Sequence, residues 1–143
     1  PVLEGLKNKQ VYAKDQERKA QVEQTAIRTS IRYFEQLGYT VRSVEKDNCG
    51  WDLEADAGKT SLRIEVKGLS GDVFNIGLTP NEYKAFAKQA DDYRLSVVTN
   101  VLEEPKLFIC RFSQEQNYWI AETEGQSPKK LNIELISSAS ISC

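Results

Sequence analysis

The sequence predicts a single α/β domain in which a mixed sheet is flanked by helices. The chain has 143 residues, of which 40% are apolar and 28% charged, and this is enough for one domain with a sizeable core. A helical pattern precedes three strand-like segments, and a well-capped helix then precedes a further apolar strand. A strand, a helix and a second strand in that order form a crossover to a parallel strand. The resulting order is helix, three strands, helix and two strands, with a small C-terminal addition.

The first helix is predicted over residues 18–37, and Gly38 is a natural stop after it. Apolar residues at helical spacing form its buried stripe: Ala20, Ile27, Ile31 and Phe34 on one line, with Val22, Ala26, Tyr33 and Leu37 beside it. Glu23 lies on the same line, where a carboxylate is costly unless it has a partner or a metal. Helix geometry by itself favours the other interpretation, in which Glu23 reaches solvent at the helix start, where it also suits the helix dipole. Residues 1–17 are predicted to be a linker or an N-terminal helical extension.

Strands are predicted over residues 39–44, 50–56 and 60–67, with a turn at 57–59. Thr79 as N-cap, Pro80 at the first helical position and Glu82 at the third form a capping box that starts the second helix. Its predicted buried stripe is Tyr83, Phe86, Ala87 and Ala90. Further strands follow over residues 94–101 and 106–112, then a short helix over 113–120 and an edge strand over 131–136. The core of the domain would span 18–112, and 113–143 would be an addition to it.

The hairpin of the second and third strands carries the most informative residues. Side chains alternate between the faces of a strand, so the apolar row Trp51, Leu53 and Ala55 and the apolar row Leu62, Ile64 and Val66 must share one face. Asp52, Glu65 and Lys67 then lie together on the other face. A two-residue loop at 57–58 sets Asp52 diagonal to Glu65, and a four-residue loop sets the two residues opposite each other. Either arrangement brings both carboxylates within reach of one ion.

Two interpretations of this polar face remain open. An amphipathic hairpin carries acids and bases on its wet face by default, and Glu65 and Lys67 could be a plain surface ion pair. The other interpretation is a functional cluster, which is favoured by Gly50 and Gly68 on either side of it, since glycine lets a backbone or ligand approach closely.

Composition limits the chemistry that the chain can perform. It has no histidine, so Asp, Glu, Lys or Tyr must carry any acid–base or metal chemistry. Its net charge is −2, whereas a self-sufficient DNA-binding protein is usually basic. Three scattered cysteines form no disulfide or zinc pattern, which predicts a reducing, intracellular (cytoplasmic) location, with Cys110 in the core. No apolar run approaches the roughly 18 residues of a membrane span. The chain begins with Pro1 and has no methionine, which predicts that it is cut from a longer polypeptide.

These residues resemble the motif of the PD-(D/E)xK nuclease superfamily, which is an acid on the second strand and (D/E)-x-K on the third. Asp52 and Glu65-Val66-Lys67 match it, and Glu23 matches an acid that many members carry on the first helix. More narrowly, Gly-Trp-Asp-Leu, Ile-Glu-Val-Lys-Gly, Leu-Thr-Pro-Asn-Glu from Leu78 and Tyr-Arg-Leu-Ser-Val-Val from Tyr93 resemble the domain family named after the C-terminus of the plant protein NO VEIN. The superfamily's proline before the first acid is absent, since Cys49 and Gly50 precede Trp51-Asp52.

The resemblance implies a restriction-endonuclease-like core and a metal-dependent nuclease (phosphodiesterase) that hydrolyses nucleic acid, DNA in the first place. Asp52, Glu65 and the backbone carbonyl of Val66 would bind Mg²⁺ or Mn²⁺, Glu23 would contribute directly or through water, and Lys67 would orient the attacking water. The expected partners are nucleic acid, the other domains of a longer restriction, defence or helicase-type protein, and a second copy of the chain. The alternative is a catalytically silent nuclease-like fold that docks nucleic acid or another protein.

Overall fold

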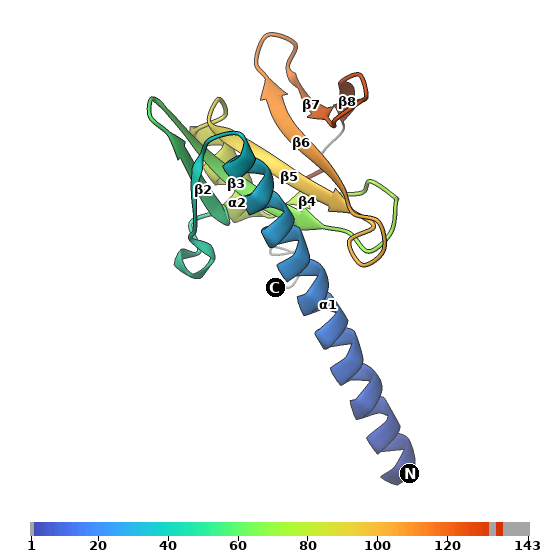
Figure 1. The fold of residues 1–143 in the computed structure, drawn as a ribbon. Helices are drawn as coiled ribbons and strands as arrows, with labels where there is room; N and C mark the ends of the chain where they lie inside the picture. Colours follow the sequence, from blue (N-terminus) through green and yellow to red (C-terminus); the bar gives the residue numbers. More distant parts are fainter. Residues whose placement is uncertain (1, 132–133, 136–143) are drawn as a thin grey trace.

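The computed structural model describes residues 2–131 and 134–135 of the chain. Figure 1 shows how its helices and strands are arranged. In chain order they are α1 (Val2–Gln36), β1 (Thr40–Ser43), the 3-10 turn η1 (Glu45–Asp47), β2 (Leu53–Ala57), β3 (Thr60–Gly68), β4 (Gly77–Leu78), α2 (Pro80–Lys88), β5 (Tyr93–Thr99), β6 (Lys106–Ser113), β7 (Tyr118–Glu122), β8 (Lys129–Leu131) and β9 (Glu134–Leu135).

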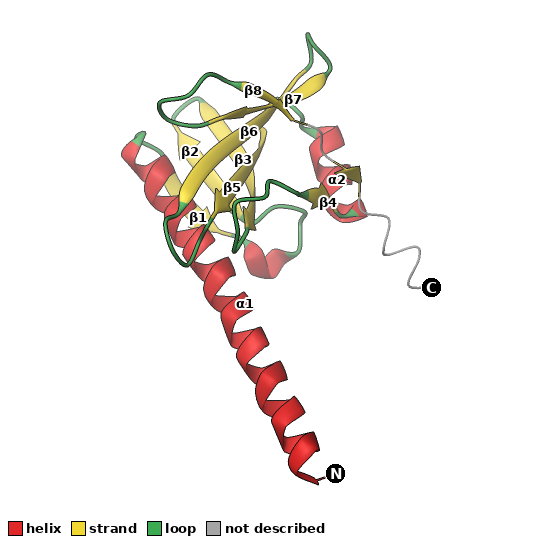
Figure 2. Cartoon of the chain, turned by 90° about the vertical axis from the view of Figure 1, so that its right-hand side faces the viewer, coloured by secondary structure: helices red, strands yellow, loops and turns green. Residues whose placement is uncertain are grey.

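A seven-stranded mixed sheet forms the centre of the domain, in the order β1-β2-β3-β5-β6-β7-β8. Strands β3 and β5 are parallel, as the crossover through α2 requires, and the other neighbours are antiparallel. The short strands β4 and β9 form a separate parallel pair. Helices α1 and α2 cover opposite faces of the large sheet (Figure 2). The predicted α/β class with a mixed, helix-flanked sheet is therefore confirmed.

Helix α1 begins much earlier than the predicted start at residue 18, and its first half projects away from the sheet (Figure 1). The described side chains from residue 9 to residue 21 are exposed, and Val22 is the first buried one. The prediction used an apolar stripe as its signal, and a helical segment without a packed face lacks that signal. One continuous helix therefore runs through both the predicted N-terminal extension and the predicted core.

The buried line of α1 is displaced from the predicted stripe. It consists of Val22, Ala26, Ser30 and Phe34, whereas Ala20 and Leu37 are exposed. Ser30 can be buried on this otherwise apolar line because its hydroxyl group has partners. The hydroxyl donates to the Ala26 carbonyl (2.8 Å) and lies 2.7 Å from the hydroxyl of buried Ser96 on β5. A buried serine pair of this kind is satisfied within the fold, and an apolar pattern cannot reveal it.

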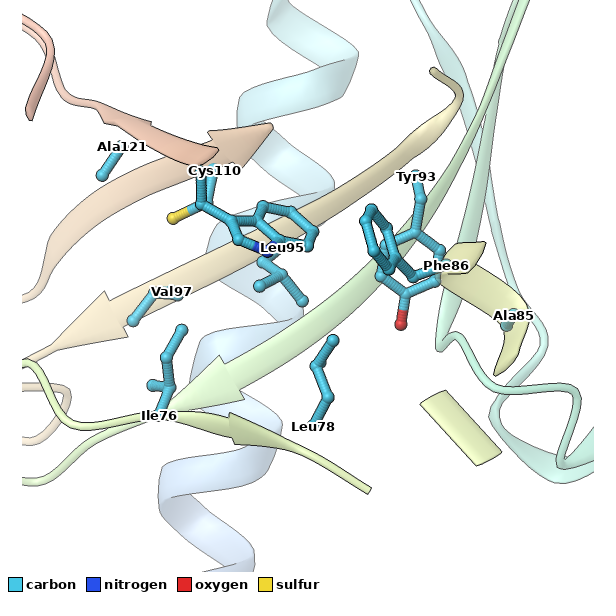
Figure 3. Close-up of a cluster of buried hydrophobic side chains, with 10 residues drawn as sticks. Ile76, Leu78, Ala85, Phe86, Tyr93, Leu95, Val97, Cys110 and Ala121 are labelled. Atoms are coloured by element: carbon cyan, nitrogen blue, oxygen red, sulfur yellow. The ribbon is translucent and has the colours of Figure 1, made fainter. Parts of the chain in front are cut away.

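A hydrophobic core lies between α2 and the face of the sheet that is opposite α1, and Figure 3 shows its side chains. They are Ile76, Leu78, Ala85, Phe86, Tyr93, Leu95, Val97, Cys110, Trp119 and Ala121. The predicted capping box at Thr79 and Glu82 is present, and Phe86 and Cys110 are buried as predicted. Tyr83 and Ala87 are exposed, and Ala85 is buried in their place, so the predicted stripe of α2 is wrong by part of a turn.

The C-terminal part of the chain differs from the prediction. Residues 113–120 form no helix, because β6 and β7 make an antiparallel hairpin with a turn that ends at Asn117 (φ 61°). Alternation across β7 buries Trp119 and Ala121, which is a strand pattern. The predicted edge strand at 131–136 lies partly outside the described residues, and the described part contains the end of β8 and the short strand β9.

No helix in the described ranges combines the length and the apolar character needed to cross a membrane.

Candidate active site

The β2–β3 hairpin turns through the two residues Gly58 and Lys59, and its register pairs Leu53 with Ile64. Continued by one residue, this register sets Asp52 opposite Glu65, the relation predicted for a four-residue loop. The loop itself has two residues and lies one residue later than the predicted 57–58. Leu53, Ala55, Leu62 and Ile64 pack together beneath Phe34 of α1. Glu65 and Lys67 therefore point toward the α2 face. The predicted separation of apolar and charged rows along β3 is confirmed.

Trp51 does not continue the apolar row of β2, contrary to the prediction. It packs against the core on the α2 side, its indole N–H donates to Glu54 (3.0 Å), and the Arg63 guanidinium lies 5.3 Å from its ring centroid. The cause is that β2 begins only at Leu53. Gly50, at φ 98°, turns the chain before the strand, so alternation does not extend back to Trp51.

Gly50 and Gly68 allow the two helices to approach the hairpin. A Cβ on Gly50 would lie 2.7 Å from the Ala85 Cβ and 3.0 Å from the Asn81 carbonyl oxygen, both on α2. A Cβ on Gly68 would lie 2.9 Å from the Ala26 Cβ and 3.1 Å from the Val22 carbonyl oxygen, both on α1. The sequence suggested close approach by a backbone or a ligand, and the approaching groups are the two helices.

Asp52, Glu65 and Lys67 lie together just before the start of β2, beside the second half of β3. The backbone amide of Val66 donates to Oδ2 of Asp52 (2.9 Å), which joins the two strands through a side chain. Nζ of Lys67 lies 3.6 Å from Oε2 of Glu65. Glu65 is only 7% exposed, so it is not part of a plain surface ion pair. The predicted trio of side chains is brought together.

A cavity of about 440 Å³ opens beside this trio. It forms because β2 pairs with β3 only as far as Ile64, which leaves the last part of β3 with β5 as its one neighbour in the large sheet. Its lining includes Asp52, Glu65, Val66 and Lys67 from the hairpin, Glu23 and Ile27 from α1, Glu45, and Gly68, Leu69, Asn75, Ile76 and Gly77. Glu23 is exposed, as its solvent-reaching interpretation predicts, and it also lines the cavity.

Burial dominates the electrostatics of the two hairpin carboxyl groups. It raises the pKa of Glu65 to about 10, and repulsion from Asp52 and then from Glu82 acts in the same direction, against the smaller opposing effect of Lys67. Burial also raises the pKa of Asp52, partly opposed by the hydrogen bond from the Val66 amide. Both groups are thus harder to ionise here than in water. A bound positive ion would oppose this upward shift of their pKa values.

Glu82 lies beside Asp52, Glu65 and Lys67, although the sequence predicted only its part in the capping box. Its Oε1 accepts from Nζ of Lys67 (2.8 Å) and from the backbone amide of Thr79 (3.0 Å). Burial would raise the pKa of Glu82, but these two hydrogen bonds outweigh it and hold the pKa below its usual value. The capping-box motif was the one sequence signal for it, because the cap requires this side chain to fold back over the helix start.

The donor atoms present suit a hard divalent cation. Asp52 and Glu65 supply two neighbouring carboxylates, and Mg²⁺ is typically held by one or two carboxylates with waters completing its shell. In the part of the chain that the structure describes, no group of three or more Asp, Glu, Cys or His side chains is arranged to hold a metal ion. Glu23, Asp52 and Glu65 share the cavity without forming such a group.

Comparison with known proteins gives one family. The family described as Protein NO VEIN, C-terminal, matches residues 22–110 of this chain, and the match includes every residue of the cluster. No curated protein and no solved structure matches the chain.

Proposed function

The chain belongs to the family of the C-terminal domain of Protein NO VEIN, and from this premise we propose that it is a metal-dependent nuclease domain of the PD-(D/E)xK type. The observation that carries the proposal is the position of Asp52, Glu65 and Lys67 together on the wall of one cavity. The order α1, β1, β2, β3, α2, β5, with β3 parallel to β5, supports a restriction-endonuclease-like core.

In this proposal Asp52, Glu65 and the backbone carbonyl of Val66 would hold Mg²⁺ or Mn²⁺, and Glu23 of α1 would contribute directly or through water. When bound, such an ion lowers the pKa of a water molecule and stabilises the negative charge that develops on a phosphodiester during hydrolysis. Asp52 keeps its orientation through the Val66 amide. Glu65 would have to be ionised to hold the ion, since a carboxyl group binds a metal in its deprotonated form.

Lys67 is a positively charged side chain on the cavity wall. In the proposed mechanism it acts on the attacking water and on the phosphate. Its ammonium orients the attacking water and stabilises the charge on the phosphate oxygens. The side chain is 20% exposed, so it can reach the cavity while its stem is packed. The ammonium lies 2.8 Å from Oε1 of Glu82 and 3.6 Å from Oε2 of Glu65, which places it beside the proposed metal ligands.

We propose that the substrate is nucleic acid, DNA in the first place. The net charge of −2 gives the chain no general attraction for a polyanion. Delivery of the substrate would therefore fall to other domains of a longer restriction, defence or helicase-type protein, in an intracellular setting. A second copy of the chain would allow both strands of a duplex to be cut.

Nicking of supercoiled plasmid DNA tests the proposal. The chain is expected to nick the plasmid with Mg²⁺ or Mn²⁺ and not with EDTA, and Lys67→Ala is expected to abolish nicking. Cleavage that continues in both Lys67→Ala and Asp52→Ala would rule out this mechanism.

A catalytically silent docking module is the second candidate, and one contact favours it. The Lys67 ammonium lies nearer to Glu82 (2.8 Å) than to Glu65 (3.6 Å), as in a structural ion pair. Calorimetric titration with Mn²⁺ separates the two functions. A nuclease site binds Mn²⁺ and loses this affinity in Glu65→Ala, whereas a docking module shows no Mn²⁺ affinity in either protein.

A further inference from the structure

We infer that Glu82 is a positioning residue, which holds the Lys67 ammonium in place for the proposed nuclease reaction; the inference rests on that proposed function. Neither the motif of Asp52, Glu65 and Lys67 nor the family match assigns a role to Glu82. Its assignment comes from the contacts that its carboxylate makes with a strand and with its own helix start.

Glu82 makes a direct contact with Lys67. Oε1 of Glu82 lies 2.8 Å from Nζ of Lys67, and the two side chains are 16% and 20% exposed. A lysine side chain loses rotamer entropy when it is held in one place. A charge-assisted hydrogen bond from a partly buried partner offsets such a loss better than a surface ion pair does.

Glu82 is itself held in place by Thr79. The same Oε1 atom accepts from the Thr79 backbone amide (3.0 Å), while the Glu82 backbone amide donates to Oγ1 of Thr79 (3.2 Å). The Thr79 backbone amide, which Thr79→Ala retains, thus fixes the direction in which the carboxylate points. Lys67 on β3 is connected through it to the first turn of α2.

Helix α2 is also fixed relative to the segment that carries Asp52. Gly50 packs against Asn81 and Ala85 of α2, and the Tyr93 hydroxyl donates to the Gly50 carbonyl (2.8 Å). The start of α2 and the segment before β2 therefore form one packed unit. Glu82 places the lysine relative to both acids of the hairpin.

The test is Glu82→Gln in the 143-residue chain, compared with Thr79→Ala. A glutamine at 82 retains the capping box, because its amide oxygen still accepts from the Thr79 amide. It removes the negative charge that lies beside the Lys67 ammonium. The alanine at 79 removes the cap hydroxyl and keeps the charge. If Glu82 were merely structural, Glu82→Gln would lower Tm and leave kcat unchanged.

Initial rates of plasmid nicking with Mn²⁺ give the first readout. For Glu82→Gln, kcat is expected to fall at least tenfold, with KM within about twofold of the wild-type value and Tm within about 2 °C of it. Thr79→Ala is expected to lower Tm by several degrees and to keep most of kcat at 20 °C. A wild-type kcat in Glu82→Gln would overturn the inference.

The second readout does not need activity. The ¹H–¹⁵N spectrum of lysine ammonium groups shows a separate, slowly exchanging signal for an ammonium held in an ion pair. The Lys67 signal, assigned through Lys67→Arg, is expected in the wild type and in Thr79→Ala and to be lost in Glu82→Gln. Its persistence in Glu82→Gln would overturn the inference. A wild-type chain without any nicking activity contradicts the proposed function instead, and this spectrum still decides whether Glu82 holds Lys67.

Discussion

Oδ2 of Asp52 accepts a hydrogen bond of 2.9 Å from the backbone amide of Val66. This bond crosses from the residue before β2 to the middle of the Glu-x-Lys segment on β3. It holds the first acid of the cluster beside the second at the point where the regular pairing of the two strands stops at Leu53 and Ile64. The relative placement of Asp52 and Glu65 is therefore a property of the folded hairpin.

The buried carboxyl group of Glu65 is expected to make stability depend on pH. Its pKa is about 10 in the folded protein against an ordinary value of 4.5. Between these values the folded state keeps a proton that the unfolded state has lost, so stability falls as pH rises. Glu65→Gln is expected to remove this contribution, which reaches about 1.4 kcal/mol per pH unit for one proton.

Urea unfolding at pH 6 and pH 9, in buffer with EDTA, measures this contribution. Glu65→Gln should gain stability relative to the wild type as the pH increases. The exposed Glu35→Gln is the matched control for the loss of a glutamate charge. Equal pH dependence in Glu65→Gln and in the wild type would contradict the assignment of a proton to Glu65.

Gly50 and Gly68 are expected to tolerate alanine poorly. Gly68→Ala places a Cβ 3.1 Å from the Val22 carbonyl oxygen, which should cost about 1–3 kcal/mol, as overpacking usually does. Gly50→Ala should cost more, because φ is 98° there and the Cβ would also meet α2. Gly71→Ala is the control, since no atom lies within 4 Å of its added Cβ. Equal midpoints of urea unfolding for Gly68→Ala and Gly71→Ala would refute this packing argument.

The Ser30–Ser96 hydrogen bond is expected to couple α1 to β5. Both residues are fully buried, and their hydroxyl oxygens are 2.7 Å apart. Each single substitution by alanine leaves the other hydroxyl with fewer partners, which should cost roughly 1–3 kcal/mol. The double variant should be destabilised by less than the sum of the two, as a double-mutant cycle of unfolding free energies would show. Strict additivity would mean that the two hydroxyl groups do not interact.

The sequence predicted the sheet well where an apolar pattern or a capping motif was present. The alternating rows of β3, the crossover to β5 and the capping box of α2 all follow from residues that are near neighbours in the chain. For the projecting half of α1 the sequence left a linker and a helical extension open, because the exposed side chains from residue 9 to residue 21 form no apolar stripe that would favour one of them. The helix predicted at 113–120 was wrong because the alternating burial of Trp119 and Ala121 belongs to a strand.

The candidate site was predicted in part. Parity along β3 placed Glu65 and Lys67 on one face, but it failed for Trp51, because Gly50 turns the chain before β2 begins. Glu82 was recognised only as a cap. Its second contact, with Lys67, depends on how α2 packs against the hairpin, and that packing depends on Gly50, Ala85 and Tyr93, which are far apart in sequence. Tertiary contacts of this kind leave no local pattern.

The most direct test of the proposed nuclease compares Asp52→Asn with Asp56→Asn in Mn²⁺-dependent nicking of supercoiled DNA. Both substitutions remove one carboxylate from the same hairpin, but Asp52 lines the cavity and Asp56 is exposed near the turn. Asparagine at 52 can still accept the hydrogen bond from Val66, so folding should be retained. The account predicts nicking by the wild type and by Asp56→Asn at similar rates, and a loss of at least a hundredfold in Asp52→Asn. Equal nicking by all three proteins, or none by the wild type, would contradict it.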